Sequence, residues 1–319
     1  MVELWFLGTS AGRPIPGRNV SAAVLQLPPE RGAFWLFDCG EGTQHQLLAT
    51  PFRLSRLERI FITHLHGDHI FGLPGLLGSR SSLGASEPLD VYGPAGLREW
   101  IETSMRLSGS RLGYELRLHE LADEGIVCED ERFVVTCAAL DHRIDCFGYR
   151  IAERPRPGML NTERLSSLGL RPGPLYGRLK RGEDVTLPDG TVVRSADVIG
   201  APVPGRVVTI LGDTRPCPAI ARLAEGADVL VHEATFDETL AEKAAAYGHS
   251  TTRQAAEAAR DAGARKLILT HFSTRFTDAA LPGLAEEARR YFPETEAAEQ
   301  LKPYPIGRAR GERQAGSRD

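Results

Sequence analysis

The amino-acid sequence predicts a layered α/β protein in which helices cover buried β-strands. Short runs of aliphatic, β-branched and aromatic residues alternate with helical patterns, which is typical of this architecture. The predicted strands are residues 4–7, 33–37, 59–62, 207–211, 228–231 and 266–269. Most of these runs are followed at once by polar residues, so we expect functional groups at the strand ends.

Two stretches near the C-terminal side of the chain predict helices. Residues 252–262 are rich in alanine and are followed by Gly263, a residue that favours helix ends. Residues 281–291 form the second predicted helix. Helices interspersed with buried strands support the layered α/β prediction.

Length and composition fit an ordinary soluble enzyme. The chain has 319 residues, 42% hydrophobic and 25% charged, which suffices for one large domain or two smaller ones. No apolar run approaches the roughly 18 residues that cross a bilayer, and the N-terminus reads as a strand and not as a secretion signal. We therefore expect a cytoplasmic protein with no membrane partner, and we expect no small organic cofactor.

The charge is distributed unevenly along the chain. The net charge of −4 by itself disfavours a nucleic-acid partner, because phosphate binding needs lysine and arginine on the contacting surface. Residues 150–182, however, contain eight basic and two acidic residues, so this stretch carries +6 and the remainder −10. A second basic stretch, residues 306–319, has the composition of a disordered tail. The basic segment is a candidate RNA-binding surface; a solvated loop with excess arginine is the alternative.

Three histidines and an aspartate gather within six residues just after the predicted strand 59–62. They are His64, His66, Asp68 and His69. Core packing gives no reason for such a cluster, whereas imidazole and carboxylate are ligands that Zn²⁺ binds well. Alternation along an extended segment places His64 and His66 on one side, and Asp68 and His69 begin the next turn. One loop can therefore serve two neighbouring ions; a solvated polar loop is the alternative.

Further candidate ligands stand at other strand ends. Asp213 follows strand 207–211, His271 follows strand 266–269, and His142 comes after another apolar run. A carboxylate can bridge two ions, which suits Asp213 because it lies between two histidine-bearing strands in the sequence. A lone histidine at a strand end is more often a structural residue, but the combination with the first loop favours a two-metal site.

The ligand series resembles the metallo-β-lactamase superfamily. More narrowly, the chain resembles the short-form ribonuclease Z family of tRNA 3′-processing endonucleases from residue 6 to about residue 292. The motifs that carry this narrower resemblance are residues 6–9, 37–44, 72–80, 232–235 and 249–251. The resemblance implies an α/β fold of the αββα metallo-β-lactamase type with a protruding flexible arm, and a homodimer. It implies a catalytic domain at residues 1–305, the arm at about residues 150–195, and a tail at residues 306–319.

The resemblance also implies two Zn²⁺ ions per subunit. One ion would be held by His64, His66 and His142 and the other by Asp68, His69 and His271, with Asp213 and a water molecule as bridges. Zinc lowers the pKa of bound water from 15.7 toward about 7, so a hydroxide held between the ions could attack a phosphodiester. The same ligands accept Mn²⁺ or Co²⁺, so the sequence does not decide the metal.

The proton transfers are implied by the same resemblance. Asp68 would accept a proton from the attacking water, and Glu233 would orient and charge His249, which would protonate the leaving 3′ oxygen. His249 has an alternative interpretation as part of a helix start, because the hydroxyls of Ser250 and Thr251 suit N-capping. Both roles are compatible.

The basic segment corresponds to the arm with which this family clasps the tRNA elbow, and Gly173-Pro174 matches the arm's glycine-proline motif. The implied RNA contacts of the arm are Arg154, Arg156, Arg171, Gly173, Pro174, Arg178, Lys180 and Arg181. Residues 14–19 resemble the family motif P-x-K-x-R-N, whose Arg18 and Asn19 would contact the acceptor end. Pro16 replaces the lysine, which leaves open how precursors that carry CCA are treated.

We therefore expect a zinc-dependent endoribonuclease that cleaves tRNA precursors on the 3′ side of the discriminator nucleotide, leaving a 3′-hydroxyl on the tRNA and a 5′-phosphate on the trailer. A metallo-hydrolase of small phosphodiesters or thioesters is the alternative, but it leaves the basic arm unexplained. An RNA-binding scaffold without activity ranks last, because all seven candidate ligands are present. The sequence does not decide whether there is additional exonuclease activity.

Overall fold

The computed structural model describes residues 2–308 and divides into two compact units. Unit 1 comprises residues 2–152 and 207–307, and unit 2 comprises residues 153–206 together with Arg308. Most of the tail predicted at residues 306–319 lies outside the described residues.

Unit 1 contains two seven-stranded sheets, with the strand orders β16-β1-β2-β3-β4-β5-β6 and β15-β14-β13-β12-β9-β8-β7. The strands of the first sheet are β1 (Glu3–Gly8), β2 (Ala22–Gln26), β3 (Phe34–Phe37), β4 (Leu57–Phe61), β5 (Leu89–Pro94), β6 (Leu116–Leu121) and β16 (Pro303–Pro305). Those of the second are β7 (Gly125–Glu129), β8 (Phe133–Ala139), β9 (Phe147–Glu153), β12 (Val207–Ile210), β13 (Val229–Glu233), β14 (Leu267–Thr270) and β15 (Thr295–Ala297).

The core lies on both faces of each sheet, because side chains alternate along a strand. Trp35 and Phe37 of β3 belong to the buried cluster between the sheets, which also contains Tyr149 of β9. Phe34 and Leu36 of the same strand belong to the cluster beneath the helices of the first sheet. Both faces of β3 are therefore buried, which explains its continuous apolar sequence.

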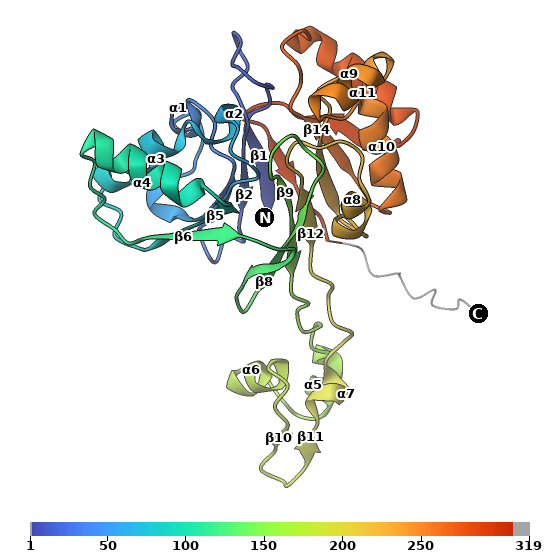
Figure 1. Cartoon of the computed structure of the whole chain (residues 1–319). Helices are drawn as coiled ribbons and strands as arrows, with labels where there is room; N and C mark the ends of the chain where they lie inside the picture. The colour runs from blue at the N-terminus through green and yellow to red at the C-terminus, as the bar shows by residue number, and fades with distance from the viewer. Residues whose placement is uncertain (1, 309–319) are drawn as a thin grey trace. The chain divides into compact units, whose positions relative to one another are not determined.

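Helices cover the outer face of each sheet, as Figure 1 shows for α3 and α4 on one side and α8, α10 and α11 on the other. The first sheet is accompanied by α1 (Thr43–Leu47), η1 (Leu54–Arg56), α2 (Gly67–Ile70), α3 (Leu73–Ser82) and α4 (Leu97–Ser108). The second is accompanied by α8 (Pro218–Leu223), η2 (Glu238–Leu240), α9 (Ala241–Tyr247), α10 (Thr252–Asp261), η3 (Asp278–Ala280) and α11 (Leu281–Arg289). The predicted αββα sandwich is confirmed.

The predicted elements are confirmed, with ends that differ from the structure by at most two residues. The strands β12, β13 and β14 run parallel to one another, so their carboxyl ends meet at one edge of the second sheet. This edge carries Asp213, Glu233 and His271, and ligands generally bind at such edges. Among the helices described for residues 2–308, none combines the length and apolar character needed to cross a membrane.

Unit 2 is inserted between β9 and β12 and has a core of its own. It contains α5 (Thr162–Ser167), α6 (Pro174–Lys180), α7 (Ser195–Val198) and a hairpin of β10 (Val185–Thr186) and β11 (Val192–Val193). Its buried cluster consists of Leu165, Leu170, Leu179, Val185, Val193 and Val198. The arm expected at about residues 150–195 is therefore a small folded body that spans residues 153–206.

The C-terminal part of unit 2, residues 183–206, reduces the net positive charge of the unit. Residues 153–206 contain nine basic and six acidic residues and carry +3, whereas the sequence stretch 150–182 carries +6. Arg150, which belongs to that stretch, lies in β9 of unit 1, where its guanidinium donates to the carbonyls of Leu223 and Glu225 at 2.9 and 2.8 Å. The binding of an anion to unit 2 therefore depends more on where the basic side chains of the unit lie than on the net charge of the unit.

Candidate metal centre

The loop after β4 is fixed against the segment that follows β3. The amide of Cys39 donates to the carbonyl of His69 at 2.7 Å. Gly40 allows this close approach, because a Cβ at position 40 would stand 2.3 Å from the carbonyl oxygen of Asp68. His64 and His69 are buried, with 0% and 2% of their surface exposed. The loop is thus a rigid support for its four candidate ligands.

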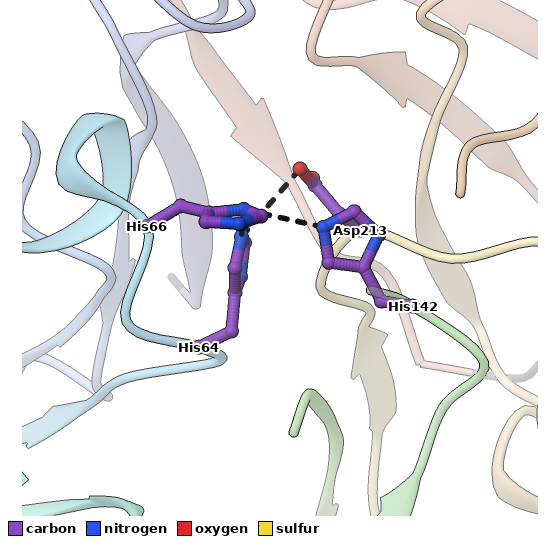
Figure 2. Close-up of side chains that lie close together, drawn as sticks. All are labelled: His64, His66, His142 and Asp213. Atoms are coloured by element: carbon purple, nitrogen blue, oxygen red, sulfur yellow. Dashed lines mark hydrogen bonds and ion pairs between the residues drawn. The ribbon is translucent and has the colours of Figure 1, made fainter. Parts of the chain in front are cut away.

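One cluster of side chains brings together His64, His66, His142 and Asp213, which Figure 2 shows converging from the loop after β4, the loop after β8 and the end of β12. Nδ1 of His66 lies 3.1 Å from Nε2 of His64 and 3.2 Å from Nε2 of His142. Oδ2 of Asp213 lies 3.6 Å from Nε2 of His64.

A second cluster joins Asp68, His69 and His271. Nε2 of His271 lies 3.3 Å from Oδ2 of Asp68 and 3.3 Å from Nε2 of His69. Oδ2 of Asp213 lies 3.3 Å from Nε2 of His271 and 3.6 Å from Nε2 of His69, so the same oxygen adjoins both clusters. The structure therefore brings together all seven residues selected from the sequence as ligands.

Hydrogen bonds on the outer side of the rings fix which nitrogen faces the cluster. Nδ1 of His69 donates to Oδ2 of Asp38 at 2.7 Å. The hydroxyl of Thr63 donates to Asp38 at 2.9 Å and accepts from Nδ1 of His64 at 2.9 Å. Nδ1 of His142 donates to the carbonyl of Gly248 at 2.7 Å. In each of these three rings the proton sits on Nδ1, which leaves the Nε2 lone pair directed inward.

His271 is fixed in the same way by Thr235. The Thr235 hydroxyl donates to Oε2 of Glu233 at 2.7 Å and accepts from Nδ1 of His271 at 2.9 Å. The rings of His271 and His69 therefore both turn Nε2 inward, and these two nitrogens lie 3.3 Å apart. Two lone pairs at this separation repel unless a proton or a metal ion lies between them, so the donor set fits a divalent metal ion that takes the place of a proton.

Sequence reasoning missed Asp38, Thr63 and Thr235, which orient the rings but do not face the cluster. Asp38 has a φ of 57° and His271 a φ of 56°, both in the left-handed region that residues other than glycine seldom adopt. Such strain concentrates at functional sites, where the surrounding structure holds it in place. A sequence signal existed, because Asp38 lies in the motif 37–44 and Thr235 in the motif 232–235.

The buried charges oppose one another within the site. Burial by itself would raise the pKa of Asp213, but the charges of His271, His69 and His64 lower it well below its usual range. Burial would lower the pKa of His69, but Asp213 and Asp38 raise it well above its usual value. The metal-free protein therefore keeps a proton on His69 that a metal ion would displace.

Glu233 and His249 form a buried pair beside the second cluster. Oε1 of Glu233 accepts from Nδ1 of His249 at 2.9 Å, and the same nitrogen lies 3.8 Å from Oδ2 of Asp213. Burial would lower the pKa of His249, but the charge of Glu233 and this hydrogen bond raise it to about 9. His249 therefore holds a proton at neutral pH and keeps Nε2–H available as a donor.

His249 does not cap the following helix. The N-cap of α10 is Thr251, whose side chain accepts from the amide of Gln254, and the side chain of Gln254 accepts from the amide of Thr251 in a capping box. The amide of Ser250 donates to Oε1 of Glu233 at 3.0 Å. Thr251 therefore caps α10, whereas His249, two residues earlier, pairs with Glu233.

The loop of residues 14–19 ends in a tight turn, and its two predicted RNA contacts differ in exposure. The amide of Ile15 donates to the carbonyl of Arg18 at 2.9 Å, and Pro16 with Gly17, whose φ is 83°, closes the turn. Arg18 is 3% exposed and donates to the carbonyl of Phe276 at 2.8 Å. The buried guanidinium of Arg18 therefore stabilises the loop through this hydrogen bond.

Asn19 is held by the neighbouring backbone. Its side-chain amide donates to the carbonyl of Glu41 at 2.8 Å, and its main-chain amide donates to the side chain of Gln300 at 2.6 Å. Arg18 and Asn19 therefore fix the shape of the loop, and contact with an RNA acceptor end would have to be made from these positions.

The predicted RNA contacts of unit 2 fall into two groups. Arg156 donates to the buried carboxylate of Glu153, and Arg178 and Arg181 both pair with Glu183. Arg154, Arg171, Gly173, Pro174 and Lys180 have exposed surfaces. Arg178 and Arg181 are exposed as well, so all of these predicted contacts except Arg156 have exposed surfaces.

The sequence matches the family described as the beta-lactamase superfamily domain over residues 35–159 and 177–272. Ribonuclease Z of Anoxybacillus flavithermus is 55% identical over 305 residues, which cover 96% of this chain and 97% of that protein. Ribonuclease BN of Enterobacter sp. is 54% identical over 301 residues, which cover 94% and 98%.

The crystal structure of the short form of human tRNase Z is also similar. It superimposes with a TM-score of 0.70 at 33% identity and covers 96% of this chain and 99% of that one. Similarity thus extends over nearly the whole length of each protein, including unit 2. The chain therefore belongs to the ribonuclease Z family, metal-dependent hydrolases of phosphodiester bonds within the metallo-β-lactamase superfamily.

Proposed function

We propose that this protein cleaves tRNA precursors on the 3′ side of the discriminator nucleotide, leaving a 3′-hydroxyl on the tRNA and a 5′-phosphate on the trailer. The observation that carries this proposal is the 55% identity with ribonuclease Z over nearly the whole chain. A buried acid pair beside clusters of potential ligands supports it, because cleavage of RNA must supply a proton to a poor leaving group.

The residues that would hold the metal are the two clusters joined by Asp213. Imidazole and carboxylate ligands in groups of three or four suit Zn²⁺, so we propose two Zn²⁺ per subunit; Mn²⁺ and Co²⁺ accept the same ligands. Zinc bound there would lower the pKa of water to about 7 and polarise the phosphate. Metal analysis of protein purified without added metal tests the identity and number of ions.

The chain's own residues would move the protons. Asp68 is half-buried and accepts from the amide of Gly12 at 2.6 Å, and its pKa lies far below its usual range because the charges of His69 and His271 outweigh its burial. Its carboxylate is therefore ionised and oriented to accept a proton from the attacking water. His249 would donate its Nε2 proton to the 3′ oxygen, and Glu233 would keep the ring charged until that transfer.

Unit 2 would bind tRNA phosphates with its exposed cations. Its exposed cations lie on a body with its own core, while the rest of the chain carries −7 and repels RNA elsewhere. We also propose a homodimer, supported by the family resemblance. Light scattering on the full chain tests this assembly.

The decisive experiment is incubation with tRNA precursors extended at the 3′ end, with and without CCA, followed by mapping of the product ends. Cleavage directly after the discriminator nucleotide is the expected result. The comparison of the two precursors also measures how the Pro16 loop treats CCA. Hydrolysis of bis(p-nitrophenyl) phosphate without cleavage of any precursor would favour the alternative, a hydrolase of small phosphodiesters.

The role of unit 2 is tested without disrupting its core. Arg171→Glu combined with Lys180→Glu reverses two exposed charges, and Arg111→Glu reverses an exposed charge in unit 1 as a control. We expect the double variant to raise KM for the tRNA precursor and to flatten its salt dependence, with unchanged hydrolysis of the small phosphodiester. An equal loss on both substrates would contradict a separate RNA-binding role.

A further inference from the structure

An exposed aromatic ring lies directly on the metal-ligand loop. Phe71 follows α2, and its amide donates to the carbonyl of Gly67 at 2.9 Å. Its ring covers Gly67 so closely that a Cβ at position 67 would stand 2.2 Å from Cε2 of Phe71. On another side it stacks with Trp100, at 6.4 Å between centroids and an interplanar angle of 17°. The ring is therefore fixed in place, although 61% of Phe71 is exposed.

The ring forms part of the wall of an open cavity of about 350 Å³. His66 and Asp68, which belong to the two ligand clusters, line the same cavity, together with Arg13 and Glu41. The cavity is thus next to the place where a scissile phosphate would bind. Its walls combine the apolar side chains of Pro14, Val20 and Phe71 with one arginine and two carboxylates, a mixture that fits a flat polar ring better than it fits an anion.

We propose that this cavity holds the nucleobase adjoining the scissile phosphate, stacked on the ring of Phe71; the inference rests on the proposed cleavage of RNA. Stacking on an aromatic side chain suits any base, because every base has a flat π-face. Glu41 disfavours a phosphate inside the cavity and can accept a hydrogen bond from an exocyclic amino group. Arg13, exposed at the rim, can neutralise a flanking phosphate.

The stack would position the substrate. A base held on Phe71 fixes the nucleotide beside the reacting bond, so its loss should act on RNA and not on a substrate without bases. Phe71→Ala should lower kcat/KM for a tRNA precursor by about 5-fold to 100-fold, the range that base stacking supplies, and Phe71→Trp should retain most of the activity. Bound metal, measured by elemental analysis, should stay unchanged in both variants.

The test combines these variants with precursors that carry an abasic site on either side of the cleavage position. One abasic site should slow the wild-type enzyme as much as Phe71→Ala does, and that site should add no further loss in the variant. The side on which this happens identifies the stacked nucleotide as the discriminator or the first trailer nucleotide. Ile126→Ala, which truncates a 66% exposed side chain in β7, serves as the control.

Several results would overturn the inference. On each side of the cleavage position, an abasic site could slow the Phe71→Ala variant by the same factor as it slows the wild type. Such a result on both sides would show that the ring contacts neither base. A loss of bound metal would show that the ring supports the metal-ligand loop, and a change in oligomeric state by light scattering would show that it contacts a second copy of the chain. A wild-type enzyme that cleaves no precursor would overturn the proposed function as well, whereas an active enzyme indifferent to Phe71→Ala overturns the stacking alone.

Discussion

Replacement of Glu233 by glutamine should remove the proton of His249 at neutral pH. The two oxygens of Glu233 accept from His249 Nδ1, from the amides of Thr214, Thr235 and Ser250, and from the Thr235 hydroxyl. Every contact is a donor, so an amide at position 233 would set its own N–H against at least one of them in either orientation. The substitution therefore removes a charge and also strains a buried hydrogen-bond network.

The magnitude follows from the pKa of His249, which is about 9 with Glu233 in place and would fall to about 6.5 or below without it. At pH 7.5 the protonated fraction would drop from nearly all to about a tenth or less, so kcat for RNA should fall by at least about 10-fold. Bound metal ions would lower both pKa values by repulsion, but the difference between the two proteins would remain.

The raised pKa of His249 also predicts how the free energy of unfolding depends on pH. The raised pKa of His249 corresponds to about 3 kcal/mol in favour of the folded, protonated state. That contribution is complete below the unfolded pKa of about 6.5 and is lost as the pH rises through about 9. The difference in unfolding free energy between wild type and Glu233→Gln should therefore be large at pH 6 and should shrink above pH 9.

Three measurements check this reasoning. NMR titration of the metal-free proteins gives the two His249 pKa values. In a plot of kcat against pH, the alkaline limb, where activity falls as the pH rises, should move to lower pH in the variant. Bis(p-nitrophenyl) phosphate, whose leaving group needs no proton, should be hydrolysed almost as before. Glu242→Gln, the same change on the exposed surface of α9, is the control. An unmoved alkaline limb, or equal slowing of both substrates, would refute the acid role.

Three further predictions concern metal binding, ring orientation and the base of unit 2. Metal binding to the apoprotein should release protons and tighten as the pH rises, because the pKa of His69 is raised and a ligand imidazole must be neutral; calorimetry in buffers of different ionisation enthalpy measures the protons. Gly248→Ala should weaken metal affinity by about 10-fold to 100-fold, because Gly248 has a φ of 81° and a Cβ there would stand 2.9 Å from Nδ1 of His142; unchanged affinity would mean that the ring adapts. Glu153→Gln should cost about 1–3 kcal/mol locally, because the carboxylate is fully buried and binds Arg156, Arg206 and Arg308 at 2.8–2.9 Å. Hydrogen exchange should then quicken within residues 153–206 and remain unchanged elsewhere.

The strands that the sequence revealed most clearly are largely buried. β3 reads as an unbroken apolar run and β14 as an apolar run that ends in Thr270, whereas β6 and β7 are largely exposed and show no such run. The extent of unit 2 could not be predicted from the sequence for a related reason. Charge marks the basic half of that segment, but its boundary depends on the pairing of β10 with β11 and on a shared core, which are contacts between distant residues.

Arg18 illustrates the limit of a motif. The family resemblance implied that Arg18 contacts the acceptor end of the RNA. In the structure its guanidinium is buried against the carbonyls of Ser273 and Phe276, more than 250 residues away along the chain. Long-range backbone contacts of this kind leave no local pattern in the sequence.

The sequence by itself identified the candidate donor set. His64, His66, Asp68 and His69 are adjacent, and Asp213 and His271 follow predicted buried strands. Only the tertiary structure decided which ring nitrogen faces inward and that Phe71 stands exposed over the loop. Ligand identity is a property of single residues, whereas tautomer, charge and cavity shape depend on atoms that folding brings from far apart.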